Sequence, residues 1–212
     1  MSTPLERRRG LYAITNGPRD DLLDVCASAL AGGARLLQYR DKTGDSSRRL
    51  AEAGALLGLC RTHGVPLIVN DDVLLAQTIG ADGVHLGEDD SDLAEARERL
   101  GADAIIGVSC YDSLDRAAEL ARRGASYLAF GAFFPSPTKP AARRATAALL
   151  QAARGLGRPL VAIGGITPDN ASSLIEAGAD FVAAITGVFG AADVQSAAAR
   201  YASLFNDATD IR

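Results

Sequence analysis

The stretch GADGVHL at residues 80–86 decides the fold of this chain of 212 residues. Its glycine follows a segment in which apolar residues recur with helical spacing, and its last residues form a short run of strand length. A glycine there can take the left-handed conformation that ends a helix, and the small alanine then begins a short turn into a strand. Four further stretches place Gly-Ala before such a run: GGARLLQ at 32–38, GADAIIG at 101–107, GASYLAF at 124–130 and GADFVAA at 178–184. This recurrence predicts a repeated βα unit.

Apolar runs of strand length cover residues 11–15, 35–40, 66–70, 83–86, 104–109, 127–132, 159–164 and 181–186. Segments with helical spacing, such as 20–33 and 113–124, lie between them. This alternation indicates βαβ units and a parallel sheet. Because no boundary-like linker interrupts the chain, we expect one domain over residues 1–212, a closed (β/α)8 TIM barrel with its core at about residues 10–205. The alternative is an open doubly wound sheet, but the turn TNGPRDD at 15–21 lacks its Gly-rich fingerprint.

The composition is that of an ordinary soluble globular protein, with 48 % hydrophobic and 23 % charged residues. The net charge of −4 gives no reason to expect a nucleic-acid surface. No run reaches the roughly 18 apolar residues that span a membrane, and the first residues lack the apolar part of a signal peptide. The three cysteines lie far apart, which predicts free buried thiols and no zinc site. We expect a cytoplasmic protein that binds small molecules; the sequence leaves a homo-oligomer open.

Polar residues gather where the expected strands end, which in a TIM barrel is the rim of the active site. Gln38, Arg40 and Lys42 lie two apart, so in a strand all three point to the same side. Two cations that face a barrel interior are costly unless they meet an anion. The alternative is that the chain has left the strand at Arg40, which makes both cations exposed loop charges. Ser109 ends the fifth run, and His85 in the fourth is more typical of a hydrogen-bonded structural histidine than of a base.

Carboxylates follow the third and fourth runs. Asn70 and Asp71 end the third, and Asp90 follows the fourth. Neighbouring carboxylates attract a hard divalent cation, and Mg²⁺ takes one or two of them together with substrate phosphates. The alternative is helix capping, by Asp71 or Asp72 for one helix and by Asp90 for the next. Asp89 is a rival ligand that the spacing does not exclude.

The later strand ends favour phosphate binding. The loop at 133–144 is rich in proline and carries two hydroxyls and a cation that could clasp a phosphate: Ser136, Thr138 and Lys139. Gly165 and Gly187 follow the last two runs and let backbone N–H groups approach an anion, and the loops after these strands form the common phosphate site of TIM barrels. The alternatives are a surface loop stiffened by prolines and ordinary tight turns.

The motifs in this order resemble those of thiamine phosphate synthases. QYRDK at 38–42 is similar to that family's Q-x-R-[ED]-K, and the stretch at 70–90 to its ND…GADGVHLGQ-x-D segment. IIGVSC at 105–110, PSPTKP at 135–140, VAIGGI at 161–166 and AAITGV at 183–188 correspond to its remaining segments. The resemblance covers nearly the whole chain. Ser136 stands where threonine is usual and Thr186 where serine is usual, and both keep a hydroxyl.

The resemblance implies a transferase that joins 4-amino-2-methyl-5-(diphosphooxymethyl)pyrimidine to thiazole phosphate. It would give thiamine phosphate and release pyrophosphate by a Mg²⁺-assisted dissociative displacement. The residues implied for the pyrimidine pyrophosphate are Gln38, Arg40, Lys42, Asn70, Ser109 and Lys139, of which Arg40, Lys42, Ser109 and Lys139 would also act in catalysis. The residues implied for the thiazole phosphate are Ser136, Thr138, Gly165, Ile185 and Thr186. Asp71 and Asp90 would hold Mg²⁺.

Three other functions fit parts of this pattern. A thiazole tautomerase of the same superfamily would bind only the thiazole phosphate and would need a base at the rim. Another phosphate-binding barrel, such as a sugar-phosphate isomerase, would need an acid/base pair for proton transfer. A non-catalytic sensor of thiamine intermediates would bind without turnover.

Overall fold

Eight parallel strands close into a barrel in the order of the sequence. The computed structural model describes residues 5, 8–88, 92–135 and 143–205. The strands are β1 (Gly10–Ile14), β2 (Leu36–Tyr39), β3 (Leu67–Asn70), β4 (Gly83–Leu86), β5 (Ile105–Tyr111), β6 (Tyr127–Phe130), β7 (Leu160–Ile163) and β8 (Phe181–Ala184). The pairing of β8 with β1 closes the ring. The predicted TIM barrel is therefore confirmed.

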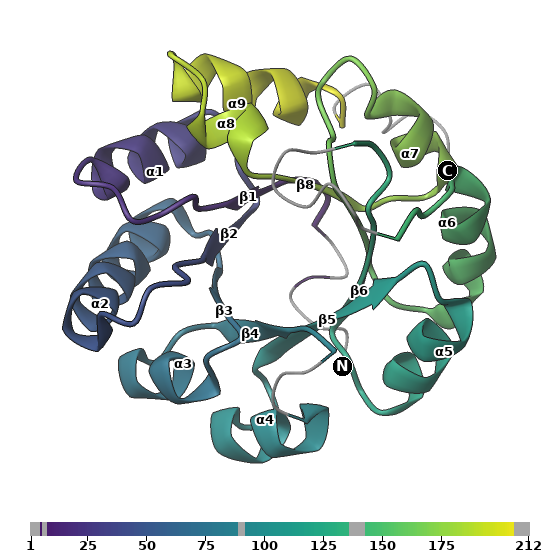
Figure 1. The fold of residues 1–212 in the computed structure, drawn as a ribbon, viewed down its shortest axis with the longest axis horizontal. Helices are drawn as coiled ribbons and strands as arrows, with labels where there is room; N and C mark the ends of the chain where they lie inside the picture. The colour runs from purple at the N-terminus through teal and green to yellow at the C-terminus, as the bar shows by residue number, and fades with distance from the viewer. Residues whose placement is uncertain (1–4, 6–7, 89–91, 136–142, 206–212) are drawn as a thin grey trace.

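Helices surround the ring of strands (Figure 1). They are α1 (Leu22–Ala31), α2 (Ser46–His63), α3 (Val73–Ile79), α4 (Leu93–Leu100), α5 (Leu114–Arg122), α6 (Ala147–Ala153), α7 (Ser172–Ala177), α8 (Thr186–Phe189) and α9 (Val194–Ser203). A short 3₁₀ turn, Arg154–Leu156, follows α6. Asp or Ser side chains accept a backbone N–H at the start of α2, α3, α4, α5 and α9, which satisfies a donor that the first turn leaves without a partner.

The strands match the eight apolar runs, and their ends differ from the predicted ones by at most two residues. The strand β5 runs on to Tyr111 because a register shift between Ser109 and Tyr111 inserts an extra residue against β6. The five Gly-Ala joints agree with the prediction in part, because Gly80 and Gly178 end a helix in the left-handed conformation whereas Gly101 follows α4 with a ψ of 171°. Each of their glycines has a positive φ, namely Gly33 (96°), Gly80 (69°), Gly101 (89°), Gly124 (94°) and Gly178 (117°).

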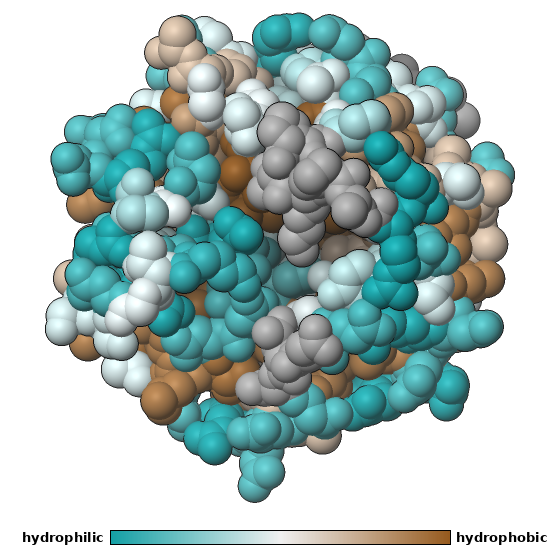
Figure 2. All heavy atoms as spheres, in the orientation of Figure 1, coloured by the Kyte–Doolittle hydropathy of each residue, from teal (hydrophilic) through white to brown (hydrophobic). Residues whose placement is uncertain are grey.

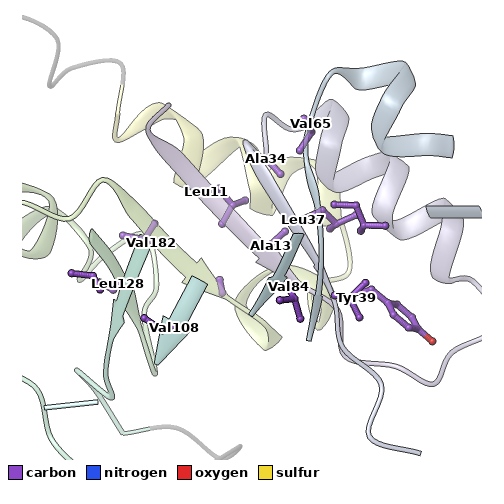
Figure 3. Close-up of a cluster of buried hydrophobic side chains, with 14 of the residues drawn as sticks. Leu11, Ala13, Ala34, Leu37, Tyr39, Val65, Val84, Val108, Leu128 and Val182 are labelled. Carbon is purple, nitrogen blue, oxygen red and sulfur yellow. The ribbon is translucent and has the colours of Figure 1, made fainter. Parts of the chain in front are cut away.

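The core has two layers because side chains alternate along each strand. Leu11 and Leu37 point away from the barrel axis and pack in the cluster between the strands and the helices (Figure 3). Tyr12 and Leu36, one residue along, belong to a second cluster inside the barrel. Leu5, with none of its surface exposed, also belongs to this inner cluster, so a residue well before β1 helps to fill the barrel.

The three cysteines are free and buried, as predicted. Burial raises the pKa of each thiol to about 12. Among the described residues, no helix is both long enough and apolar enough to cross a membrane.

Candidate active site

A cavity of about 800 Å³ opens at the carboxyl ends of the strands. Every strand contributes at least one residue to its wall: Tyr12, Gln38, Asn70, His85, Ser109, Ala129, Val161 and Ala183. Figure 2 looks along the barrel, and hydrophilic side chains surround the centre of the face that it shows. The predicted gathering of polar residues at one rim is therefore present in the described part of the chain.

Gln38, Arg40 and Lys42 line this one cavity. Only Gln38 lies within β2, where it is 2 % exposed, because the strand ends at Tyr39. The alternative that the chain leaves the strand at Arg40 is thus correct, yet Arg40 and Lys42 still line the cavity. The backbone of Arg40 is held by Thr15, whose Oγ1 accepts from the Arg40 amide at 2.8 Å and donates to its carbonyl at 3.1 Å. This contact fixes the direction in which the chain leaves β2.

Asp71 and Asp72 have different roles, although they are adjacent. Asp72 begins α3, where its Oδ1 accepts from the Leu75 amide at 2.9 Å. Asp71 lies at the rim of the cavity with a φ of 63°, and it forms an ion pair with Lys42. The Asn70 amide donates to the Asp71 carboxylate at 2.6 Å. The capping alternative therefore applies to Asp72, and the Asp71 carboxylate faces the two polar neighbours that also line the cavity.

The second proposed Mg²⁺ ligand, Asp90, and its rival Asp89 lie outside the described residues. The start of α4 is capped by Asp92, whose Oδ1 accepts from the Ala94 amide at 2.7 Å. Capping of this helix by Asp90, the alternative considered above, is therefore wrong. Within the described ranges, no group of three or more His, Cys, Asp or Glu residues could hold a metal ion. A site built on Asp71 would thus need a contribution from substrate or from residues 89–91.

Five buried or half-buried side chains form a hydrogen-bonded chain across the cavity floor. Gln38 Nε2 donates to Tyr12 Oη at 2.7 Å, and the two phenol oxygens of Tyr12 and Tyr127 are 2.8 Å apart. His85 Nδ1 lies 2.9 Å from Tyr127 Oη, and His85 Nε2 lies 2.9 Å from Ser109 Oγ. Burial raises the pKa of both phenols, which keeps them protonated. His85 is hydrogen-bonded, as predicted, but it also lines the cavity.

The glycines after β7 stand where other chain segments approach closely. A Cβ on Gly165 would lie 2.4 Å from the Pro135 carbonyl oxygen, and one on Gly164 would lie 2.4 Å from Ala132 Cβ. A Cβ on Gly187 would lie 2.2 Å from Tyr201 Oη. Gly164 and Gly165 therefore permit the loops after β6 and β7 to pack together, and Gly187 permits α8 to approach Tyr201 of α9. Gly165, Ile185 and Thr186 line the cavity.

Comparison with known proteins agrees with this arrangement. The sequence matches the family described as thiamine monophosphate synthase over residues 11–188. The chain belongs to the thiamine monophosphate synthase family. A thiamine-phosphate synthase of Chromobacterium violaceum is 57 % identical over 201 residues, which cover 94 % of this chain and 97 % of that protein. A thiamine-phosphate synthase of Xanthomonas campestris is 54 % identical over 202 residues, covering 95 % and 98 %.

Solved structures share the fold of this chain. A thiamine phosphate pyrophosphorylase from Pyrococcus furiosus superposes with a TM-score of 0.87 at 32 % identity, covering 97 % of this chain and 99 % of that one. A 3-hexulose-6-phosphate synthase superposes with a TM-score of 0.68 at 17 % identity, which shows a common fold alone. The chain is therefore an enzyme of the transferase class, and the resemblance in its motifs is confirmed.

The resemblance assigns three residues of the loop between β6 and α6 to substrate binding. Ser136, Thr138 and Lys139 lie outside the described residues. The end of that loop is described, and there Arg143 lies over the Tyr111 ring, with 4.4 Å to its centroid. Arg143 also pairs with Glu88 at 2.7 Å, which joins the loop after β6 to the loop after β4. Sequence reasoning missed Arg143, since a basic residue in a proline-rich loop carries no specific signal.

Sequence reasoning also missed Tyr12 and Tyr127. Both lie in strands that otherwise read as apolar, and a tyrosine in such a run is usually a core residue. The available signal was periodicity. Tyr12, Gln38 and His85 fall on the same inward face of their strands, so a polar side chain on each could have indicated a connected group.

Proposed function

We propose that this enzyme joins 4-amino-2-methyl-5-(diphosphooxymethyl)pyrimidine to thiazole phosphate, forming thiamine phosphate and pyrophosphate. One structural observation supports this specific pair of substrates, in addition to membership of the family. A single cavity is lined by Arg40 and Lys42, which follow β2, and by Gly165 and Thr186, which follow β7 and β8. A substrate pair with a diphosphate at one end and a monophosphate at the other matches this distribution.

The bond changes require little proton transfer. The lone pair of the thiazole nitrogen forms a bond to the CH₂ carbon of the pyrimidine, and the bond from that carbon to the diphosphate oxygen breaks. The electron pair of the broken bond leaves on pyrophosphate. Because the nucleophile already has a free lone pair, the protein needs no strong base. The electron-rich aminopyrimidine can support positive charge on the carbon as the bond breaks, which makes the displacement dissociative.

The protein's main task in this reaction is to stabilise the leaving group. Arg40 and Lys42 would contact the departing pyrophosphate, where fixed positive charges act most strongly because charge develops there. Lys139 would add a third cation from the loop after β6. Asn70 and Ser109 would orient the pyrimidine pyrophosphate, together with Gln38. Gly165, Ile185 and Thr186 would hold the thiazole phosphate, with Ser136 and Thr138.

Asp71 suits a role as a Mg²⁺ ligand. It offers hard carboxylate oxygens at the rim beside Lys42, and α3 takes its cap from Asp72 instead. We propose Asp90 as the second carboxylate ligand. Bound Mg²⁺ would neutralise negative charge on the departing pyrophosphate oxygens. The Asp71–Lys42 ion pair would then open so that Lys42 can reach the substrate.

The experiment that tests this function mixes purified protein, both phosphorylated substrates and Mg²⁺, and measures thiamine phosphate and pyrophosphate. The expected result is equal amounts of the two products, with none when either substrate is left out. Conversion of the thiazole phosphate alone would instead indicate the tautomerase. Binding of both substrates without any product would indicate a sensor.

A further inference from the structure

The hydrogen-bonded chain in the cavity floor can run in either of two directions. Its members are Gln38 on β2, Tyr12 on β1, Tyr127 on β6, His85 on β4 and Ser109 on β5. Barrel interiors are normally filled with branched apolar side chains, so a connected polar row is unusual there. The two ends, Gln38 and Ser109, are the residues proposed above to hold the pyrimidine. The three residues between them connect one wall of the cavity to the other.

The number of hydrogens that each group carries allows two directions for the row. A phenol has one hydrogen to donate and can also accept, and a neutral imidazole carries one N–H. In one direction, Tyr12 donates to Tyr127 and Tyr127 donates to Nδ1 of His85, which places the ring proton of His85 on Nε2. In the other direction, Nδ1–H of His85 donates to Tyr127 and Tyr127 donates to Tyr12.

The last step of the row reaches the substrate side of the cavity. In the first direction, with its proton on Nε2, His85 donates to Ser109 Oγ. The hydroxyl of Ser109 thus accepts from His85 and keeps its own hydrogen for the ligand. At the other end, one N–H of the Gln38 amide donates to Tyr12, and the carbonyl oxygen can accept from the ligand. Toward the ligand, Ser109 is therefore a hydrogen-bond donor and the Gln38 carbonyl is an acceptor.

Packing holds Tyr127 in the middle of this row. A Cβ on Gly107, which pairs with Tyr127 in the β5–β6 register, would lie 1.8 Å from Tyr127 Cζ, so the ring occupies the space above that glycine. The ring stacks on His85 with centroids 5.6 Å apart and meets Tyr12 edge-on at 5.9 Å. Tyr127 has none of its surface exposed, and it alone of the five residues does not line the cavity.

We propose that Tyr127 is a positioning residue that fixes His85 as the Nε2–H tautomer and thereby makes Ser109 a hydrogen-bond donor opposite the accepting carbonyl of Gln38. The identity of the ligand rests on the proposed function. An aminopyrimidine offers ring nitrogens that accept and an amino group that donates, which matches the two ends of the row.

The tautomer can be measured directly by NMR, because the chain has two histidines and one of them, His63, is exposed at the end of α2. His63→Gln, labelled with ¹⁵N-histidine, leaves the signals of His85 alone. We expect an N–H on Nε2 and an unprotonated Nδ1. A proton on Nδ1 would overturn the proposal. This measurement needs no buried substitution and no substrate, so its outcome is independent of whether the proposed reaction occurs.

Two phenol deletions then separate Tyr127 from its neighbour. In Tyr127→Phe, Nδ1 loses its donor, and we expect a mixture of tautomers. In Tyr12→Phe, Tyr127 can still donate to Nδ1, so the Nε2–H form should persist. An unchanged tautomer in Tyr127→Phe would contradict the assignment.

Kinetics give the functional readout for Tyr127. The loss of one oriented hydrogen bond should lower kcat/KM for the pyrimidine substrate about tenfold in Tyr127→Phe. The KM for thiazole phosphate should be unchanged, since none of the hydrogen bonds of the row goes to Gly165, Ile185 or Thr186. An equal loss for both substrates would indicate a general structural role and would overturn the positioning role.

Discussion

Asp71→Asn and Asp72→Asn form a matched pair, in which the same substitution at adjacent residues should change the Mg²⁺ dependence of activity at Asp71 and leave it unchanged at Asp72. The backbone at Asp71 has a φ of 63°, a left-handed conformation that Asn tolerates as well as Asp, so the substitution adds no backbone strain. At Asp72, Asn caps a helix about as well as Asp. Both variants should therefore fold, and each should differ from the wild type mainly by the loss of one negative charge.

The magnitudes follow from the partners. Asp71→Asn loses an ion pair with Lys42, whose side chain is 58 % exposed, so the free energy of unfolding should change by less than about 1 kcal/mol. Asp72→Asn loses the pair with Arg49 at 2.8 Å and should likewise change stability by about 1 kcal/mol or less. The affinity for Mg²⁺, however, should differ between the two variants. Loss of a group that only supports a metal ligand typically costs 10–100-fold in affinity, so loss of charge on a ligand itself should cost at least about that.

The assay is the initial rate of pyrophosphate release against Mg²⁺ concentration, with urea unfolding of each variant as the stability control. Asp71→Asn should need at least about tenfold more Mg²⁺, or fail at any concentration, while Asp72→Asn should follow the wild-type curve. Asp90→Asn should resemble Asp71→Asn, and Asp89→Asn should matter less. An unchanged Mg²⁺ curve for both Asp71→Asn and Asp90→Asn would refute the metal assignment. A large effect at Asp89 with none at Asp90 would move the second ligand by one residue.

Three further predictions concern the loop, the barrel interior and the thiols. Lys139→Ala should lower kcat/KM about 10²–10³-fold with little change in stability, because it removes a cation from the departing pyrophosphate; near-normal kinetics would make Lys139 a surface charge. Gly107→Ala should destabilise the protein by about 1–3 kcal/mol in urea unfolding, because its methyl group would displace the Tyr127 ring. Gly58→Ala, in α2 with no atom near its Cβ, is the control and should be neutral or stabilising; equal losses would contradict the packing argument. The buried thiols have a pKa raised from 9.0 to about 12, so the folded state keeps protons that the unfolded state releases. Unfolding free energy should then fall as pH rises through that window, by up to about 1.4 kcal/mol per pH unit for each thiol, and a flat urea midpoint from neutral pH to pH 10 would refute this.

The sequence predicted the barrel well because its signals are local and repeated. Each Gly-Ala joint marks a helix end through a backbone conformation that glycine adopts readily, and each apolar run is long enough for one strand. The ends of the strands were predicted less accurately than their number and order. The extension of β5 to Tyr111 depends on a register shift against β6, and pairing between strands is not encoded in the spacing of one run.

The site was predicted as a set of rim residues, and this part could be read from position alone. Gln38, Arg40, Lys42, Asn70, Asp71 and Ser109 all line the cavity. The different roles of Asp71 and Asp72 could not be predicted from the sequence. Both residues precede the same helix, and only the backbone geometry decides which one caps it. The hydrogen-bonded row through Tyr12, Tyr127 and His85 was also not predicted, because it joins strands that are far apart in the sequence.

The central claim is that pyrophosphate leaves at the rim formed by the loops after β2, β3 and β4. A crystal structure with pyrophosphate and Mn²⁺ in place of Mg²⁺ tests it most directly, because Mn²⁺ gives an anomalous signal that locates the metal. The account predicts a metal coordinated by Asp71 and Asp90, with the pyrophosphate in contact with Arg40 and Lys42. A metal and pyrophosphate bound away from Asp71, for example at Gly165 and Thr186 alone, would contradict it.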